Sequence, residues 1–292
     1  MRVEVNGVRL FVDIDGAEYV ADGPGMKQRP TLILLHGGPG LDHSSLKNEL
    51  GFLRDEMQTV FVDHRGNGRS DRASPETWTL EQWADDVREL CNVLGIERPI
   101  VMGQSFGGFV AQMYAARHPE QPSGLIFSST SPRLREERNL AVFERLGGPE
   151  VRRIAAEFYA TPCVETLGPF VAECMPHYNT RFSDPDGMSR TLVNIDVLLD
   201  FFANQYPKAD LAPGLANVRC PTLVLGGEDD PTTPIEDQLD IVAALPEEWT
   251  EFHRFPDCGH GAYRDCPDEA IPILREFVRR VSGSGLGLGL EA

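Results

Sequence analysis

The sequence predicts an α/β fold with a mostly parallel central sheet, flanking helices and an inserted helical cap. Two observations predict it. Short, nearly all-apolar runs alternate with segments whose apolar residues recur at helical spacing, which is typical of strand–helix–strand units. Between residues 132 and 213 this alternation stops, and helical segments are instead broken by proline and glycine. A chain of 292 residues is long enough for one such core with one insertion.

The chain is expected to begin with a β-hairpin. Two runs that alternate polar and apolar residues, 3–5 and 8–14, flank the dipeptide Asn6-Gly7, which favours a type I′ turn. The apolar runs that follow, 31–35 and 59–62, suit strands buried on both faces. The sheet should therefore start with an antiparallel edge and become parallel after it.

The remaining elements alternate as a doubly wound sheet requires. Apolar residues at helical spacing predict a helix over 80–94, and Gly95 follows it as a stop signal. The other expected elements are strands at 99–103, 125–128, 221–225 and 251–255 and helices at 106–117, 150–159, 189–205, 235–245 and 269–281. We divide the chain into core residues 1–131, a cap at 132–213, core residues 214–282 and a disordered, glycine-rich tail at 283–292.

Charge and hydropathy exclude several kinds of partner. Acidic residues outnumber basic residues by 45 to 27, and the net charge of -18 would repel nucleic acid and anionic membranes. No apolar stretch approaches the roughly 20 residues that a membrane helix needs. The N-terminus alternates like a strand and does not resemble a signal peptide. We therefore expect a soluble, cytoplasmic protein that acts on a small molecule or short peptide, with its oligomeric state left open.

The six cysteines show no metal or redox pattern. They are scattered, without a Cys-x-x-Cys pair or the neighbouring histidines that would form a zinc site. Cys258 lies two residues before His260, where it could sense oxidation, but a buried and unreactive thiol is the better interpretation. We therefore expect neither a metal site nor a redox role.

Residues 103–107, GQSFG, fit a turn that presents a nucleophile. They follow one expected strand and open the next helix, which is the setting in which a strained turn exposes a catalytic serine. Glycines on both sides relieve crowding at such a turn. The alternative is an ordinary glycine-rich turn, and the strand–helix context favours Ser105 as a nucleophile.

A serine hydroxyl needs a base and a third group that orients the base. His260, in the loop DCGHGAY after the last core strand, is the best candidate because that loop should reach the carboxyl-terminal edge of the sheet. Three consecutive carboxylates follow the strand TLVLGG, and only one can face the histidine. We favour Asp230, directly before Pro231, over Asp229. The order Ser, Asp, His is that of the α/β-hydrolases.

Backbone amides for an oxyanion hole are expected in residues 36–40, HGGPG. This loop follows an apolar strand, and its glycines let an oxyanion approach the backbone closely. We assign the N–H groups of Gly38 and Phe106 to the hole, with Gly37 as the alternative first donor. The loop lacks the lysine and hydroxyl residue of a nucleotide-binding P-loop. Residues 63–71, DHRGNGRSD, are interpreted as a tight turn whose Arg and Asp hold loops together.

Taken together, the segments HGGPG, DHRGNGRSD, GQSFGG, GGEDDPTTP and GHGAYRDCP resemble the proline iminopeptidase branch of the α/β-hydrolases. The resemblance covers most of the chain outside the cap. It implies release of N-terminal proline from peptides without a metal or an organic cofactor. Two positions depart from the family pattern. Phe106 stands where a Trp or Tyr commonly follows the nucleophile, and Pro231 follows the acid where some relatives place a glutamate.

The resemblance also implies that acidic residues of the cap surround the free amine of the substrate. Asp196 and Asp200 lie one helical turn apart in the otherwise apolar segment LVNIDVLLDFF, so they could share a face toward the pocket. A solvated face is the alternative. We expect a serine hydrolase that releases proline or a similar residue by acyl transfer, and a carboxylesterase or lactonase acting on neutral esters is the alternative.

Overall fold

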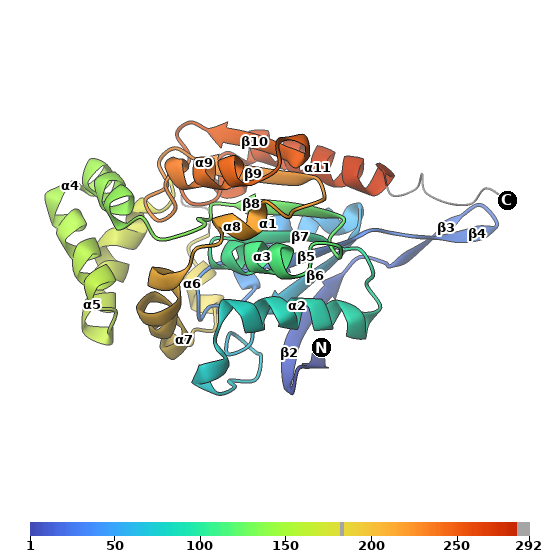
Figure 1. Cartoon of the computed structure of the whole chain (residues 1–292), viewed down its shortest axis with the longest axis horizontal. Helices are drawn as coiled ribbons and strands as arrows, with labels where there is room; N and C mark the ends of the chain where they lie inside the picture. Colours follow the sequence, from blue (N-terminus) through green and yellow to red (C-terminus); the bar gives the residue numbers. More distant parts are fainter. Residues whose placement is uncertain (182–183, 285–292) are drawn as a thin grey trace.

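One central sheet organises the chain. The computed structural model describes residues 1–181 and 184–284. Within these residues, eight strands form a sheet in the order β1-β2-β6-β5-β7-β8-β9-β10 (Figure 1). The strands are β1 (Arg2–Val5), β2 (Val8–Asp15), β5 (Thr31–Leu35), β6 (Gln58–Asp63), β7 (Ile100–Gln104), β8 (Gly124–Ser128), β9 (Thr222–Gly227) and β10 (Thr250–Phe255).

The sheet is antiparallel at one edge and parallel from there on. β1 pairs with β2, and β2 with β6, in antiparallel register. The neighbours from β6 through β5, β7, β8 and β9 to β10 all run parallel. The first turn has positive φ at both Asn6 (45°) and Gly7 (77°), as a type I′ turn requires. The predicted hairpin and the predicted α/β fold class are therefore confirmed.

Helices cover both faces of the sheet because its inner strands are apolar on both sides. These helices are α1 (Ser44–Leu50), α2 (Leu80–Leu94), α3 (Phe106–Arg117), α9 (Ile235–Ala244), α10 (Ala262–Asp265) and α11 (Pro267–Ser284). In β5, Ile33 and Leu35 belong to the core that contains α2 and α3. Leu32 and Leu34 point to the other face, where α1 and α11 pack. The alternation along one strand thus builds two hydrophobic cores.

The segment between β8 and β9 is helical, and most of it lies beyond one end of the sheet, whereas its last helix packs against α3 and α9 (Figure 1). Its α-helices are α4 (Glu136–Ala160), α5 (Val164–Pro169), α6 (Gly187–Arg190), α7 (Ile195–Asp200) and α8 (Ala212–Leu215). Its other helices are the π-helices η3 (Phe170–Cys174) and η5 (Phe201–Gln205) and the 3-10 helices η4 (Met175–His177) and η6 (Tyr206–Lys208). The cap with boundaries at residues 132 and 213 remains a prediction for this segment.

Two helices of this segment differ from their predicted ranges. The helix predicted at 150–159 is the second half of α4, which bends at Gly148 (φ 82°) before Pro149. The helix predicted at 189–205 is interrupted, because residues 191–194 are not helical. There the N–H of Asn194 donates to the carbonyl of Gly40 at 2.7 Å, so a contact with the core replaces a turn of helix.

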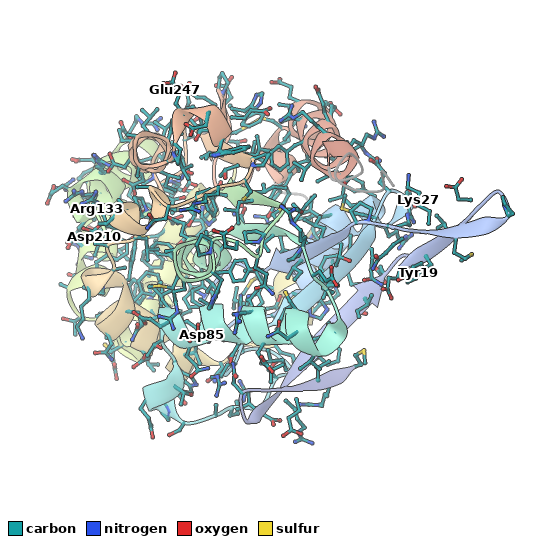
Figure 2. All side chains as sticks on the ribbon, turned by 45° about the vertical axis from the view of Figure 1, so that its right-hand side comes forward. Tyr19, Lys27, Asp85, Arg133, Asp210 and Glu247 are labelled. Atoms are coloured by element: carbon teal, nitrogen blue, oxygen red, sulfur yellow. A yellow bond between two sulfur atoms is a disulfide. The ribbon has the colours of Figure 1, made fainter. Side chains whose placement is uncertain are left out.

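A second, two-stranded sheet was not predicted. β3 (Tyr19–Asp22) and β4 (Gly25–Gln28) form a hairpin that projects from the body of the molecule, as Figure 1 shows. Figure 2 places Tyr19 and Lys27 on this hairpin. Its residues are mostly exposed, so they lack the apolar alternation by which a half-buried strand is recognised in a sequence.

The C-terminal helix extends beyond its predicted end. α11 continues through residue 284, so the residues at 283 and 284, which we assigned to a disordered tail, are helical. The rest of that predicted tail, residues 285–292, lies outside the described residues. In the part of the chain that the structure describes, no helix combines the length and apolarity needed to span a bilayer.

Candidate active site

Ser105 occupies the turn between β7 and α3 in a strained conformation. Its φ is 52° and its ψ is -116°, a region that residues with a side chain rarely adopt. The turn packs directly against the end of β5. A Cβ atom on Gly107 would lie 2.1 Å from the carbonyl oxygen of Leu35, and one on Gly103 would lie 2.3 Å from the carbonyl oxygen of Gly107. Both glycines are therefore required for this turn to form.

His260 and Asp230 are in direct contact. His260 Nδ1 lies 2.8 Å from Asp230 Oδ2. Asp230 is fully buried, and its carboxylate also accepts hydrogen bonds from the N–H of Thr233 at 3.0 Å and from its hydroxyl at 2.7 Å. Burial alone would raise the pKa of Asp230, but the charge of His260 and these hydrogen bonds outweigh burial and lower it. Asp230 is thus held as a carboxylate beside the imidazole.

The two carboxylates before Asp230 point elsewhere. Asp229 forms an ion pair with Arg145 of α4, and Glu228 forms one with Arg254 of β10. Both pairs are partly exposed to solvent. Of the three consecutive acids, the structure therefore brings to His260 the one that the sequence analysis favoured.

Thr232 is a member of this cluster that the sequence analysis missed. Its Oγ1 lies 2.9 Å from His260 Nδ1 and 3.1 Å from Asp230 Oδ1, and its backbone N–H donates to the same oxygen at 2.9 Å. An aspartate that accepts from the N–H two residues later forms an Asx turn. The spacing of Asp230 and Thr232 across Pro231 was the available signal for this turn.

The loop that carries His260 is anchored at several points. The backbone N–H of His260 donates to the carbonyl of Tyr178 at 2.6 Å, and the carbonyl of His260 accepts from Asn179 Nδ2 at 3.0 Å. A disulfide joins Cys258 to Cys266 across the histidine. The prediction that Cys258 is an unreactive free thiol is therefore wrong. Cys258 and Cys266 are eight residues apart in the sequence, a spacing that matches no recognised motif. The fold of the loop brings their Cα atoms to a distance of 6.4 Å.

The HGGPG loop passes over the serine. A Cβ atom on Gly37 would lie 3.2 Å from Ser105 Cβ, so glycine permits this close approach. His36 Nδ1 lies 3.0 Å from the carbonyl of Gly37, and its Nε2 accepts the backbone N–H of His64 at 3.3 Å. Burial lowers the pKa of His36, so the ring stays neutral and can make both bonds. His36 therefore shapes the loop.

The two assigned oxyanion donors have free N–H groups. Phe106 is the first residue of α3, so its N–H has no acceptor within the helix. Gly38 adopts a φ of 65°. Among the described residues, neither N–H donates to another backbone carbonyl or to a side chain. Both residues line the same cavity as Ser105, so both amides are available to a ligand.

Ser105 and His260 open into one cavity of about 910 Å³. No hydrogen bond joins the two side chains among the described residues. Such contacts are often loose in a ligand-free enzyme and tighten when substrate binds. The cavity lies between the sheet edge and the helical segment, with walls that include Phe109, Phe158, Phe170, Leu198, Phe201 and Phe202. Its walls are therefore largely apolar.

The segment DHRGNGRSD holds loops together. Asp63 accepts the N–H of His43 at 2.9 Å on one oxygen and the N–H of Arg69 at 2.8 Å on the other. Asn67 Oδ1 accepts the N–H of Gly40, the last residue of the HGGPG loop, at 2.6 Å. These contacts support the interpretation of the segment as structural.

Among the described residues, three carboxylates line the cavity, and each one already has an arginine partner. The ion pairs are Asp42–Arg69, Glu49–Arg264 and Asp184–Arg190. The Glu49 pair is bidentate, with distances of 2.6 Å and 2.9 Å. None of these carboxylates is therefore left to neutralise the ammonium group of a substrate.

The predicted amine-binding pair does not face the cavity. Asp196 is exposed, and Asp200 accepts a hydrogen bond from Asn204 on an exposed part of the helix. Their spacing does place them on one helical face, but the neighbouring Val197 and Phe201 point inward and are buried. In the structure, Asp196 and Asp200 lie on a solvated face of the helix, which was the alternative given for them.

Known proteins resemble this chain over nearly its full length. A sequence model described as alpha/beta hydrolase fold matches residues 30–265. A proline iminopeptidase of Pestalotiopsis fici is 26% identical over 287 residues, which cover 92% of this chain and 99% of that protein. The predicted resemblance to proline iminopeptidases is confirmed.

Solved structures show the same fold. The crystal structure of proline iminopeptidase from Mycobacterium smegmatis has a TM-score of 0.78 at 22% identity, covering 98% of this chain and 99% of that chain. A thermophilic esterase from Thermogutta terrifontis has a TM-score of 0.65 at 26% identity, covering 97% of this chain and 99% of that chain. The similarity thus includes hydrolases named for different substrates.

Proposed function

Because the chain belongs to the alpha/beta hydrolase fold family, we propose that it is a serine hydrolase with Ser105 as nucleophile, His260 as base and Asp230 as the orienting acid. The observation that carries the proposal is the 2.8 Å contact of His260 with the buried Asp230, beside the cavity that Ser105 lines. A triad is recognised by such roles and geometry more than by sequence position.

The proposed reaction is acyl transfer in two steps. His260 takes the proton of the Ser105 hydroxyl as its oxygen attacks the substrate carbonyl, and then gives that proton to the leaving group. Water hydrolyses the acyl-enzyme by the same route. Asp230 fixes the tautomer of the imidazole and stabilises its cationic form. The N–H groups of Gly38 and Phe106 hold the oxyanion, each contributing about 3 kcal/mol in the transition state.

The cavity favours a neutral ester or lactone as substrate. Its walls are largely apolar, and each of its carboxylates is paired with an arginine. Moving the ammonium group of a peptide from water into such a site is costly without a partner for its charge. This is the substrate class that the geometry supports best.

Release of N-terminal proline is the second candidate. It is supported by the motifs HGGPG and GQSFGG and by the similarity to proteins named proline iminopeptidase. This activity requires that the amine of the substrate displace an arginine from one of the cavity carboxylates, or that the amine bind without a carboxylate partner.

Three substrates separate the two candidates. They are a short nitrophenyl ester, a prolyl arylamide with a free amine, and the N-acetylated form of that arylamide. We expect the ester to have the highest kcat/KM, with little difference between the two arylamides. A prolyl arylamide that is preferred strongly over its acetylated form would instead support the second candidate.

The Ser105→Ala variant is the control for the mechanism itself. It should lower kcat by about 10⁶-fold, because the oxyanion amides and binding contacts alone provide little of the rate. Full turnover of all three substrates by this variant would overturn the proposed mechanism.

A further inference from the structure

Four apolar side chains of the helical segment line the cavity and are also exposed to solvent. They are Val171 of η3, Met188 of α6, Val193, which precedes α7, and Ile195, which begins α7. Their exposed fractions lie between 42% and 54%. A side chain that lines a cavity and is also exposed lies where the cavity opens to solvent. We call these four the mouth residues.

The apolar lining continues from the mouth to the interior of the cavity. Leu198 lies one helical turn after Ile195 and lines the same cavity, so α7 presents one apolar face from the mouth inward. Phe158 and Phe170 line the interior, where they are at most 4% exposed, and their ring centroids are 4.6 Å apart. An apolar ligand group can therefore remain in contact with apolar side chains over the whole depth of the cavity.

The mouth is held in place next to the loop that passes over the serine. The residues on both sides of Val193 are bound to the core. The N–H of Leu192 donates to Asp42 Oδ2 at 3.1 Å, and the N–H of Asn194 donates to the carbonyl of Gly40 at 2.7 Å. These apolar side chains are thus exposed on an anchored segment. A group of exposed apolar side chains at one place marks a binding site.

Charged residues of the cavity supply one cation without a carboxylate partner. The three lining carboxylates are paired with arginines, as described above. Arg181 also lines the cavity, and none of the described carboxylates forms an ion pair with its guanidinium. Arg181 is exposed, so water solvates its charge without a ligand. The charges of the cavity therefore do not require a charged group on the ligand.

We propose that the substrate carries a long apolar chain that runs from Ser105 along the buried aromatic wall to the mouth residues. The proposal deepens the function proposed above and rests on it, because Ser105 is taken as the place where the chain begins. The cavity volume of about 910 Å³ is near the upper end of the usual range for ligand pockets, about 300–1,000 Å³. A short ester would leave most of this volume unfilled.

A chain of the substrate suits the mouth residues better than a membrane does. The mouth residues line the same cavity as Ser105, so one ligand that fills the cavity also covers them. The net charge of -18 disfavours approach to an anionic lipid surface. The chain belongs to the acyl part or to the alcohol part of the ester, and both present the same apolar surface.

Binding to the Ser105→Ala protein tests the inference without depending on turnover. The probes are methyl butyl ketone and methyl octyl ketone, which differ by four methylene groups. Each fully buried methylene lowers Kd by about fourfold. Because the far end of the chain meets half-exposed residues, calorimetry should give a Kd about 100-fold lower for the longer ketone. Equal Kd values for the two ketones would overturn the inference.

Polar substitution at the mouth should weaken binding of the longer chain alone. In the Val193→Ser/Ile195→Ser background the Kd of methyl octyl ketone should rise about tenfold, and that of methyl butyl ketone should stay within about twofold. The shorter ketone thus reports that the interior of the cavity is intact. Leu239→Ser is the matched control, because Leu239 of α9 is also 42% exposed but does not line the cavity. It should change neither Kd by more than about twofold.

Three further outcomes would contradict the inference. One is a preference for the longer ketone that survives the double substitution. Another is tighter binding of 9-oxodecanoate, which has a carboxylate at the far end of the chain, than of methyl octyl ketone, and this would point to anion recognition by Arg181. The third is binding to neutral phosphatidylcholine vesicles that the double substitution abolishes, because the mouth residues would then serve a lipid surface.

Turnover distinguishes this inference from the proposed function. Nitrophenyl acetate and nitrophenyl octanoate differ in the acyl chain, and ethyl acetate and octyl acetate differ in the alcohol chain. A higher kcat/KM for the longer member of one pair supports the inference and assigns the chain to that part of the ester. Hydrolysis with equal kcat/KM within both pairs would support the serine hydrolase and contradict the chain site. Absence of all hydrolysis, together with a ketone preference that depends on Val193 and Ile195, would contradict the proposed function and support the site.

Discussion

Asp229 and Asp230 are neighbours in the chain but have opposite environments. Asp230 is fully buried and contacts His260 and Thr233, whereas Asp229 is partly exposed and holds Arg145. Both residues are aspartates, so any difference between their effects on catalysis must come from where each carboxylate lies. This makes the pair a direct test of which acid serves the triad.

The Asp230→Asn variant should lose most of its activity. An amide in place of the carboxylate favours the wrong tautomer of His260 and removes the charge that stabilises the imidazolium, so kcat should fall by about 10⁴-fold. The Asp229→Asn variant is the control, and its kcat should stay within about twofold because it loses an exposed ion pair alone. The measurement is steady-state hydrolysis of a nitrophenyl ester. A larger loss in Asp229→Asn than in Asp230→Asn would contradict the assignment.

At the residue scale, the sequence predicted side chains whose role depends on local context. Ser105 was predicted as a candidate nucleophile because a strand, two glycines and a helix surround it, and that context is local. Thr232 was missed because its role depends on where His260, 28 residues away, places its ring. For Asp196 and Asp200 the sequence left a pocket-facing and a solvated arrangement open, because their spacing defines one helical face but does not tell which way that face points.

The contact between α4 and α9 is an element-scale feature with a pH dependence. Arg138 of α4 bridges Asp237 and Asp240 of α9 at 2.7 Å and 2.9 Å. Burial raises the pKa of Asp237 to about 6, although the pairing with Arg138 opposes the rise. Asp237 thus holds its proton more tightly in the folded protein than in the unfolded chain. Its contribution to stability is greatest at low pH and is lost as the pH rises through about 6.

The Asp237→Asn variant should remove this dependence. Between pH 4.5 and 7.5 the free energy of unfolding of the natural protein should fall relative to that of the variant, by about 2 kcal/mol. Urea unfolding of both proteins at the two pH values measures the difference. Asp240→Asn is the control. Because Asp240 is partly exposed, its substitution should change the pH dependence of the free energy of unfolding less than Asp237→Asn does. A difference between natural protein and Asp237→Asn that does not vary with pH would contradict the prediction.

Elements with strongly apolar sequences and clear ends were predicted closely. β5, α2 and α3 have the predicted bounds: α2 buries one helical face, whereas β5 and most of α3 are buried on all sides. The β3–β4 hairpin buries little surface and leaves no such pattern. The interruption at residues 191–194 is fixed by a hydrogen bond to Gly40, more than 150 residues earlier, so local periodicity could not reveal it.

At the scale of the whole molecule, three distant segments meet beside the serine. Asn194, from the helical segment, donates its N–H to Gly40 at 2.7 Å and its side-chain N–H to the carbonyl of Gly66 at 2.8 Å. Leu192 donates its N–H to Asp42 at 3.1 Å. The helical segment is therefore held against the two loops beside the proposed oxyanion site, so a shift of the helical segment should also shift these loops.

Gly40 is the tightest point of this junction. Its φ is 82°, and a Cβ atom there would lie 2.2 Å from the carbonyl oxygen of Asn194. The Gly40→Ala variant must therefore strain its own backbone and push the helical segment away. We expect it to lose about 1–3 kcal/mol of stability and, because Gly38 lies two residues earlier, to lose kcat/KM by about tenfold or more.

Gly95→Ala separates backbone strain from displacement of the helical segment. Gly95 ends α2 with a φ of 70°, close to that of Gly40, but a Cβ atom there would meet no described heavy atom within 4 Å. This variant should lose about 1 kcal/mol of stability with kcat/KM unchanged, as measured by urea unfolding and ester hydrolysis. If Gly40→Ala and Gly95→Ala lost equal stability and both kept full activity, the junction would be a structural contact alone. A selective loss of kcat/KM in Gly40→Ala would instead show that the helical segment holds the oxyanion loop in its working position.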